Sequence, residues 1–216
     1  MNQKTAMKLF GLLGLLMLLS CGYADRHRNS SSCEQALVDS LEVRVQDSLF
    51  SNVHYSRSQV LDALTQAQDS QVYYRLLALY GKTFFVSSDF DSILYYNRRV
   101  KEFSRNASQS SESLQSPRWN DVLSDVYNIE GNVWMQLNRP DSAITDYKKA
   151  YEYRLKGKKL HLLPDICINT ADAYLHRSDL AHTASYYRRA LFLCDALNLS
   201  EHAQFPVYYG LGQTYM

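Results

Sequence analysis

The sequence predicts an all-α fold, an α-solenoid in which helical hairpins stack on one another. One set of small and bulky residues occurs three times, and its first members, Gly81, Gly131 and Ala171, are 50 and then 40 residues apart. In each set an aromatic follows the first residue by three positions, and a second group follows at helical spacing. An internal period of this length is typical of helical arrays, in which each unit buries its apolar face only against its neighbours.

The clearest of the three sets shows why each unit should be a hairpin. Gly131 and Trp134 lie on one face of a first helix, and Ala143, Tyr147 and Ala150 lie on one face of a second. Small residues let the two helices approach closely, and the rings fill the space beside them. The other two sets read Ala171, Tyr174, Thr183, Tyr187 and Ala190, and Gly81, Phe84, Ile93, Asn97 and Val100.

The connection between the two helices of each unit carries turn residues. Pro140 ends the first helix of the clearest unit, and Asp141 is predicted to cap the second helix with its side chain. Asp91 and Asp179 stand at comparable places in the other two units. Each set therefore predicts a helix, a tight turn and a second helix.

These spacings resemble the tetratricopeptide repeat. The resemblance places one unit at 118–157 and a second at 160–199, where Thr183 replaces the usual alanine. A degenerate unit at 71–105 has Asn97 and Val100 in place of an aromatic and an alanine. The range 204–216 resembles the first helix of an incomplete unit. The resemblance implies tetratricopeptide-type helical hairpins and a role in binding a partner.

Two further segments lie between the N-terminus and the clearest unit. The range 34–70 has helical spacing without the small residues of the repeat, with Leu37, Leu41 and Val45 on one face. We expect a helical pair that caps the array, with its turn at 51–58. The range 106–117 is rich in serine and is expected to be a surface loop or a hinge.

The first 20 residues predict export. Lys4 and Lys8 precede the apolar run Leu9–Leu19, which is too short to span a bilayer but suits a signal peptide. The run ends at Cys21 in a pattern that resembles the lipobox of bacterial lipoproteins, which implies a lipid on the Cys21 thiol. An ordinary secretory signal is the alternative. Residues 21–33 would then be a flexible tether.

The residue after Cys21 bears on the location. Gly22 is not the aspartate that resembles an inner-membrane retention signal. The resemblance thus favours an outer-membrane lipoprotein facing the periplasm, with the periplasmic face of the inner membrane as the alternative. The lipid would be the contact with the membrane.

Composition and motifs argue against several classes of function. A formal net charge of +1 and a pI near 7.7 give no electrostatic reason to expect nucleic acid. There is no Gly-rich phosphate loop, no H-E-x-x-H and no C-x-x-C, and the six histidines are scattered. We therefore expect no enzyme activity, no metal, no cofactor and no small-molecule substrate.

Two cysteines leave an alternative open. Cys167 precedes Ala171 by four residues, and Cys194 follows Ala190 by four. Those positions come near each other in an antiparallel hairpin, so the pair could form a disulfide in an oxidising compartment or remain as two buried thiols.

The resemblance also implies a binding surface. In tetratricopeptide arrays a concave groove is lined mainly by the first helix of each unit, and it binds a protein or peptide, here unidentified. The corresponding residues run from basic through amide to acidic: Arg75, Lys82, Asn128, Asn132, Gln136, Asp165, Asp172, His176, Tyr209 and Gln213. A solvated helix face is the alternative for these polar residues.

A second function is compatible with the same pattern. Longer exported repeat proteins of Bacteroidetes-type bacteria resemble the sensory ectodomains of histidine kinases or helix-turn-helix regulators. The chain could thus be the N-terminal sensing part of such a protein. An enzyme is the remote third alternative.

Overall fold

A computed structural model describes residues 33–45, 47, 51–109 and 116–215 of the chain. The predicted signal peptide, Cys21 and the tether as far as residue 32 lie outside these residues, and Cys33, the last residue of the expected tether, is already helical. Within them every regular element is a helix, which confirms the predicted all-α fold. Residues 33–45 are helical, and the further helices are α2 (Val53–Gln66), α3 (Ser70–Lys82), α4 (Phe90–Gln109), α5 (Pro117–Gln136), α6 (Pro140–Arg154), the 3₁₀ turn η1 (Leu160–Leu162), α7 (Leu163–His176), α8 (Leu180–Ala196) and α9 (Glu201–Tyr215).

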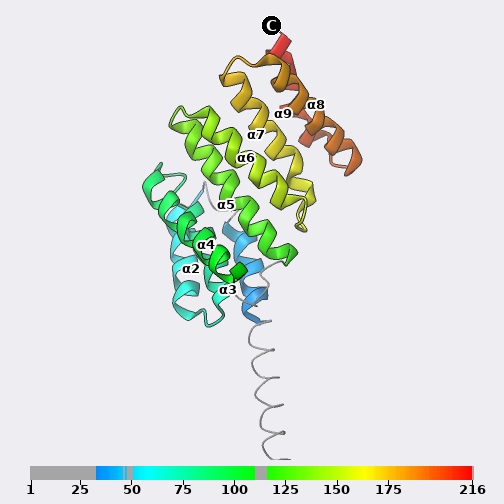
Figure 1. Cartoon of the computed structure of the whole chain (residues 1–216). Helices are drawn as coiled ribbons and strands as arrows, with labels where there is room; N and C mark the ends of the chain where they lie inside the picture. Colours follow the sequence, from blue (N-terminus) through cyan, green and yellow to red (C-terminus); the bar gives the residue numbers. More distant parts are fainter. Residues whose placement is uncertain (1–32, 46, 48–50, 110–115, 216) are drawn as a thin grey trace, which may run out of the picture. The chain divides into compact units, whose positions relative to one another are not determined.

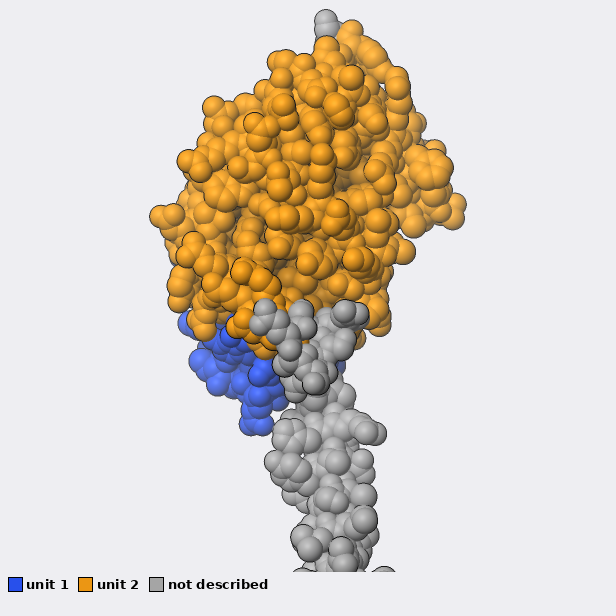
Figure 2. Space-filling view, viewed as in Figure 1, with its two compact units in different colours: residues 1–76 blue, residues 77–216 orange. Residues whose placement is uncertain are grey.

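The chain divides into two compact units (Figure 2), with the boundary inside α3. Unit 1 is Met1–Leu76 and unit 2 is Leu77–Met216. The described part of unit 1 has its own apolar core, formed by Val38, Leu41, Val45, Val60, Ala63, Val72 and Leu76.

Unit 1 differs in register from the sequence-based expectation. Leu37 is 44% exposed, and Val38 takes its place on the buried face with Leu41 and Val45. The expected turn at 51–58 is wrong beyond its first two residues, because α2 already begins at Val53. The side chain of Asn52 accepts a hydrogen bond from the backbone N–H of Tyr55 at 3.1 Å, which satisfies one of the free donors at the helix start.

Unit 2 is a stack of antiparallel neighbours. α5 packs along α6 and α7 along α8, while α6 also packs on α7 and α8 on α9 (Figure 1). Contacts also join α5 to α7 and α7 to α9. The first helices of successive hairpins therefore lie next to one another, and together they form a surface that we call the α5–α7–α9 face.

The period of the sequence recurs in the backbone of unit 2. The second helices α4, α6 and α8 begin at Phe90, Pro140 and Leu180, which repeats the spacing of 50 and 40 residues. One residue with positive φ precedes each of them: Ser88 at 54°, Asn138 at 57° and Ser178 at 60°. A left-handed residue of this kind ends a helix and turns the chain.

The same hydrogen bond closes each of these turns. The residue after the left-handed one donates its N–H to the carbonyl of the aromatic that belongs to the repeat set. The three bonds are Asp89 to Phe84 at 3.2 Å, Arg139 to Trp134 at 2.8 Å and Asp179 to Tyr174 at 3.0 Å. Because all three turns have one geometry, the two helices of each hairpin leave the turn in the same way.

The predicted helix caps are correct at one of three places. Asp179 caps α8 by accepting from the N–H of His182 at 3.2 Å. At α4 the cap is Asp89, not Asp91, and it accepts from the N–H of Ser92 at 3.1 Å. α6 has no side-chain cap, because Pro140 opens the helix and puts Asp141 inside its first turn. There Asp141 pairs with Arg177 at 2.8 Å.

The serine-rich segment is also shorter than expected. α4 continues to Gln109, so residues 106–109 are helical rather than loop. α5 begins at Pro117, and the side chain of Ser116 caps it by accepting from the N–H of Trp119 at 3.1 Å.

Small residues and tyrosines bring the helices of unit 2 together. A Cβ placed on Gly131 would lie only 2.3 Å from the ring of Tyr147, so no larger residue fits between α5 and α6 at this point. Ala143 and Ala150 are fully buried on either side of Tyr147. One layer further on, Tyr187 packs with Cys167, Ala171, Ala190 and Val207.

Candidate functional site

Two buried tyrosines connect the core of unit 2 to the α5–α7–α9 face. The hydroxyl of Tyr147 on α6 donates to Oδ1 of Asn132 on α5 at 2.8 Å. The hydroxyl of Tyr187 on α8 donates to Oδ1 of Asp172 on α7. Each tyrosine reaches the residue 15 positions before it. Asn132 and Asp172 are thus equivalent positions of successive hairpins, held from behind by the second helix.

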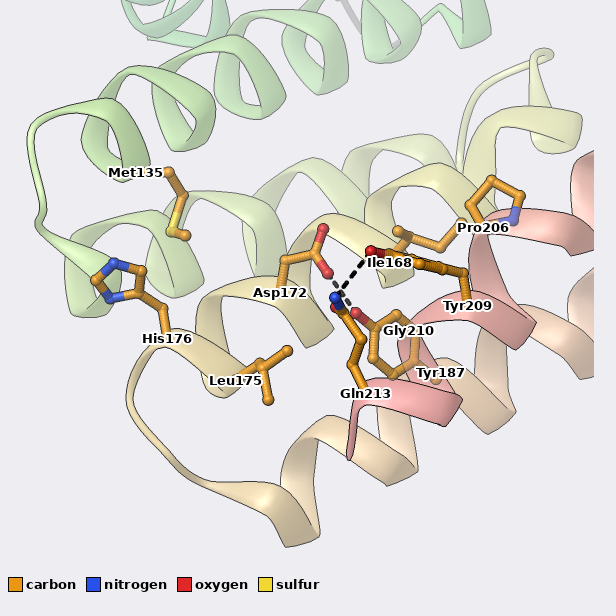
Figure 3. Close-up of a pocket in the computed structure, with 10 residues that line it drawn as sticks. All are labelled: Met135, Ile168, Asp172, Leu175, His176, Tyr187, Pro206, Tyr209, Gly210 and Gln213. Atoms are coloured by element: carbon orange, nitrogen blue, oxygen red, sulfur yellow. Dashed lines mark hydrogen bonds between the residues drawn. The ribbon is translucent and has the colours of Figure 1, made fainter. Parts of the chain in front are cut away.

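A cleft of about 480 Å³ opens on the face around Asp172 (Figure 3). This volume lies within the range of roughly 300–1,000 Å³ that is usual for ligand sites. Four helices supply its lining residues: Met135 from α5, Ile168, Asp172, Leu175 and His176 from α7, Tyr187 from α8, and Pro206, Tyr209, Gly210 and Gln213 from α9.

A glycine lets α9 approach close enough to form one wall of this cleft. A Cβ on Gly210 would lie 2.1 Å from the ring of Tyr187, so any side chain there would push α9 away from α8. Gly212, two residues further on, has open space around it. The close approach therefore depends on Gly210, the residue that lies against Tyr187.

The polar groups of the cleft meet at its centre. Figure 3 shows the carboxylate of Asp172, the hydroxyls of Tyr187 and Tyr209 and the amide of Gln213 pointing toward one another. The amide N–H of Gln213 donates to the hydroxyl of Tyr209 at 3.0 Å. Met135 and His176 lie at one end of the cleft, away from Pro206.

The carboxylate of Asp172 has no cationic partner among the described residues. No lysine or arginine lines the cleft, and the hydrogen bond from Tyr187 is the contact that the carboxylate has. Burial raises the pKa of Asp172, and the bond from Tyr187 opposes this rise only in part. The pKa of Tyr187 is raised as well, by burial first and by Asp172 second. The site thus carries a negative charge that is weakly compensated.

Four of the ten predicted groove residues come together in this cleft: Asp172, His176, Tyr209 and Gln213. Sequence reasoning missed the apolar part of the lining, namely Met135, Ile168, Leu175 and Pro206. Met135 and Leu175 each follow the aromatic of their repeat set by one position, and that shared position was the available signal.

The remaining predicted residues lie elsewhere. Asn132 is bonded to Tyr147, and Asn128 accepts from the amide of Asn169 at 3.1 Å. Gln136 and Asp165 are exposed and do not line the cleft, and Lys82 is half-buried at the end of α3.

Arg75 is not part of a groove in the structure. Its side chain is buried in unit 1, where it pairs with Asp39 at 2.8 Å and with Glu42 at 2.9 Å. It also donates to the amide oxygen of Gln35. The carboxylates of Asp39 and Glu42 compensate the charge of this buried side chain. The expected run from basic to acidic groups is therefore wrong at its basic end.

The two cysteines of the α7–α8 hairpin are free thiols, and both are buried. Burial raises the pKa of Cys167 to about 12, and it also raises that of Cys194. Because the thiolate is the reactive form, neither side chain is set up as a nucleophile.

The described residues hold no group of three or more His, Cys, Asp or Glu side chains that could bind a metal ion. The same part of the chain contains no helix with the length and hydropathy needed to cross a membrane.

Comparison with known proteins defines the fold class and goes no further. Neither a protein-family model nor a curated protein matches the sequence. A solved structure with a similar fold is the crystal structure of BtubC (BKLC) from P. vanneervenii. The TM-score is 0.64 at 18% sequence identity, over 84% of this chain and 73% of BtubC. At this identity the likeness concerns the fold alone.

Proposed function

We propose that the chain is a tetratricopeptide-type scaffold that binds an extended segment of a partner protein on its α5–α7–α9 face. The observation that carries the proposal is the cleft at Asp172, where residues of four helices combine apolar walls with convergent polar groups. A site of this composition suits a side chain together with the backbone that carries it.

The fixed geometry of the face supports peptide binding. Tyr187 holds Asp172 in place from behind, and Gln213 and Tyr209 hold each other. Side chains that are already oriented lose little conformational freedom when a ligand arrives. Gln136 and Gln213 are exposed, and their amides can bond to the backbone of a peptide of any charge.

A steric block tests this function. The full-length chain, kept in a non-ionic detergent, is applied to an array of unrelated twelve-residue peptides that covers all residue types. We expect a subset of these peptides to bind. Gln213→Trp fills the cleft and should lower the binding of that subset by about tenfold or more, since each 1.4 kcal/mol is a factor of ten.

The matched control lies on the same helix. Glu201 is exposed in the first turn of α9 and does not line the cleft, so Glu201→Trp should leave peptide binding unchanged. If no peptide binds, or if Gln213→Trp binds the same peptides as well as the native chain does, the proposal is wrong.

The second part of the proposal is a lipid anchor at Cys21 that holds the scaffold at the periplasmic side of the outer membrane. It rests on the short apolar run and the lipobox-like end of residues 1–21. Palmitate labelling in a bacterial host should mark the native chain, and Cys21→Ser should abolish the label and release the chain from membranes. Cys33→Ser, at an exposed cysteine, should change neither. Full membrane association of Cys21→Ser would contradict the anchor.

A further inference from the structure

The cleft at Asp172 has one formal charge and several unused acceptors. Oδ1 of Asp172 accepts a hydrogen bond from Tyr187, and its Oδ2 makes no hydrogen bond among the described residues. Gln213 uses its N–H to reach Tyr209, so its carbonyl oxygen is left to accept. The hydroxyl oxygen of Tyr209 accepts one bond and has a second lone pair. Three acceptors therefore converge at the centre of the cleft, and no lysine or arginine lines it.

The walls around these acceptors are apolar. Ile168, Leu175 and Met135 line the cleft on both sides of Asp172, and the ring of Tyr187 lies beneath the carboxylate (Figure 3). A ligand that suits this surface has an apolar stem and a positively charged end with several N–H donors. Aromatic faces close to such an end add to its attraction.

From this arrangement we infer that the cleft takes a lysine side chain of the bound segment, with Asp172 as the counter-ion of its ammonium group. This inference rests on the proposed peptide-binding function. The acceptor geometry favours lysine over arginine. A guanidinium binds a carboxylate best through both oxygens at once, and here one of them already accepts from Tyr187 and has a single lone pair left. An ammonium group is a compact charge with three donors, and three separate acceptors match it.

The electrostatics of the free site agree with a missing cation. Burial disfavours the charged form of Asp172, so its pKa lies above the ordinary value. A bound ammonium group would restore the counter-charge that the protein does not provide.

Met135 supplies a direct readout of the cleft. It is one of five methionines, and it is the one that lies within the described residues and lines this site. The full-length chain, labelled with ¹³C at its methionine methyl groups and held in a non-ionic detergent, is titrated with Nα-acetyl-lysine methylamide. The Met135 signal should shift and saturate. Nα-acetyl-norleucine methylamide has the apolar stem without the charge, and the arginine analogue carries a guanidinium group instead of an ammonium group. Both should bind at least about fivefold more weakly than the lysine probe, a difference of about 1 kcal/mol.

Two variants test the role of the carboxylate. Asp172→Asn keeps the shape of the side chain, and its amide oxygen can still accept from Tyr187. It should weaken the binding of the lysine probe by about tenfold. Asp165→Asn removes a charge from the same helix outside the cleft and should leave the affinity unchanged. Equal weakening by both variants, or equal binding of the lysine and norleucine probes, would overturn the inference.

A titration with pentylamine distinguishes a lysine residue from a free alkylamine as the ligand of the cleft. Tighter binding of the lysine methylamide shows that the backbone of a segment contributes, whereas tighter binding of pentylamine contradicts a lysine residue as the ligand. The peptide array distinguishes the two proposals. If its peptides bind through the cleft and lysine→methionine changes in them have no effect, peptide binding stands and the lysine inference fails; if none binds, both fail.

Discussion

The α5–α6 and α7–α8 hairpins share one frame, by which we mean their small residues and the tyrosine that packs between the helices. They differ in where they carry charge: the first has it in the core and the second on the α5–α7–α9 face. In the first, a buried arginine, Arg154, lies at the end of α6, and the position on the α5–α7–α9 face is the neutral Asn132. In the second, Cys194 takes the place of Arg154, 40 residues later, and the equivalent position on this face is the carboxylate of Asp172. Tyr147 and Tyr187 make the same hydrogen bond in both. The repeat thus fixes shape and leaves the charge of individual positions free to vary.

The buried arginine of the first hairpin offers the largest test of this comparison. Arg154 is 1% exposed and bonds to Asp121 at 2.7 Å and to Asp125. Arg154→Met would leave Asp121 buried without a cation, which typically costs about 3–5 kcal/mol. The equivalent change in the second hairpin, Cys194→Ala, removes one sulfur atom and should cost about 1 kcal/mol.

Urea unfolding followed by tryptophan fluorescence measures both changes, because Trp119 and Trp134 lie in α5 and report on unit 2. The double variant Arg154→Met with Asp121→Asn should recover part of the loss, since it removes the unpaired charge and keeps an amide oxygen that can accept from the backbone N–H groups of Lys158 and Lys159. Arg154→Met as mild as Cys194→Ala would show that the ion pair does not hold the first hairpin together.

Gly→Ala changes at three positions test the close helix approach that the hairpins share, and their expected effect on the free energy of unfolding is of intermediate size. In an exposed helix Gly→Ala stabilises by about 0.5–1 kcal/mol. At Gly131 and Gly210 the added Cβ would lie 2.3 Å and 2.1 Å from a tyrosine ring, so we expect each change to cost about 1–3 kcal/mol instead.

Gly212→Ala is the control for both, because its Cβ would meet nothing within 4 Å. It should raise the midpoint of urea unfolding, while the other two lower it. The same sign at all three positions would mean that the tyrosine rings can move aside and that close helix approach does not define the repeat.

The sequence predicted the frame well because the frame is local. Gly131 and Tyr147 are 16 positions apart on two adjacent helices, so their spacing alone indicates that they meet. Asp172 and Tyr209 could also be assigned to one face, because the face follows from helical periodicity.

The sequence-based predictions were wrong where the position of a side chain depends on contacts between distant segments. Arg75 has the spacing of a groove residue, yet it is buried because Asp39 and Glu42 lie within reach of it. Those partners belong to a helix without the repeat pattern, so no spacing in the sequence indicates their register relative to Arg75. The cap at Asp89 was placed two residues late for a related reason, since helix starts depend on turn geometry that spacing does not resolve.

The smallest effect concerns the charge at the two equivalent positions, Asn132 and Asp172, and it can be tested by exchanging the two residue types. The pKa of Asp172 is raised above its ordinary value of 3.8, mainly by burial. A carboxyl group with a raised pKa in the folded state stabilises the protein at low pH, and this contribution is lost as pH rises through the folded-state pKa. The neighbouring side chains remove part of the water around the carboxylate, but Asp172 remains exposed to solvent, so Asp172→Asn should stabilise the chain at pH 7 by less than about 1 kcal/mol. The gain should shrink to nothing below pH 3.8.

The mirror variant puts the same charge into the first hairpin. Asn132 is half-buried against the hydroxyl of Tyr147, so Asn132→Asp should destabilise the chain at pH 7 and become neutral in acid. Other titratable groups near Asp172 are Tyr187, Tyr209, Tyr147 and His176. Urea unfolding of both variants in a His176→Gln background, from pH 3 to 8, isolates the carboxylate. If Asp172→Asn does not raise the free energy of unfolding at pH 7, or if this increase does not become smaller in acid, the charged carboxylate of Asp172 does not destabilise the folded chain. In that case the free site has no need of the cation that the second hairpin is inferred to bind.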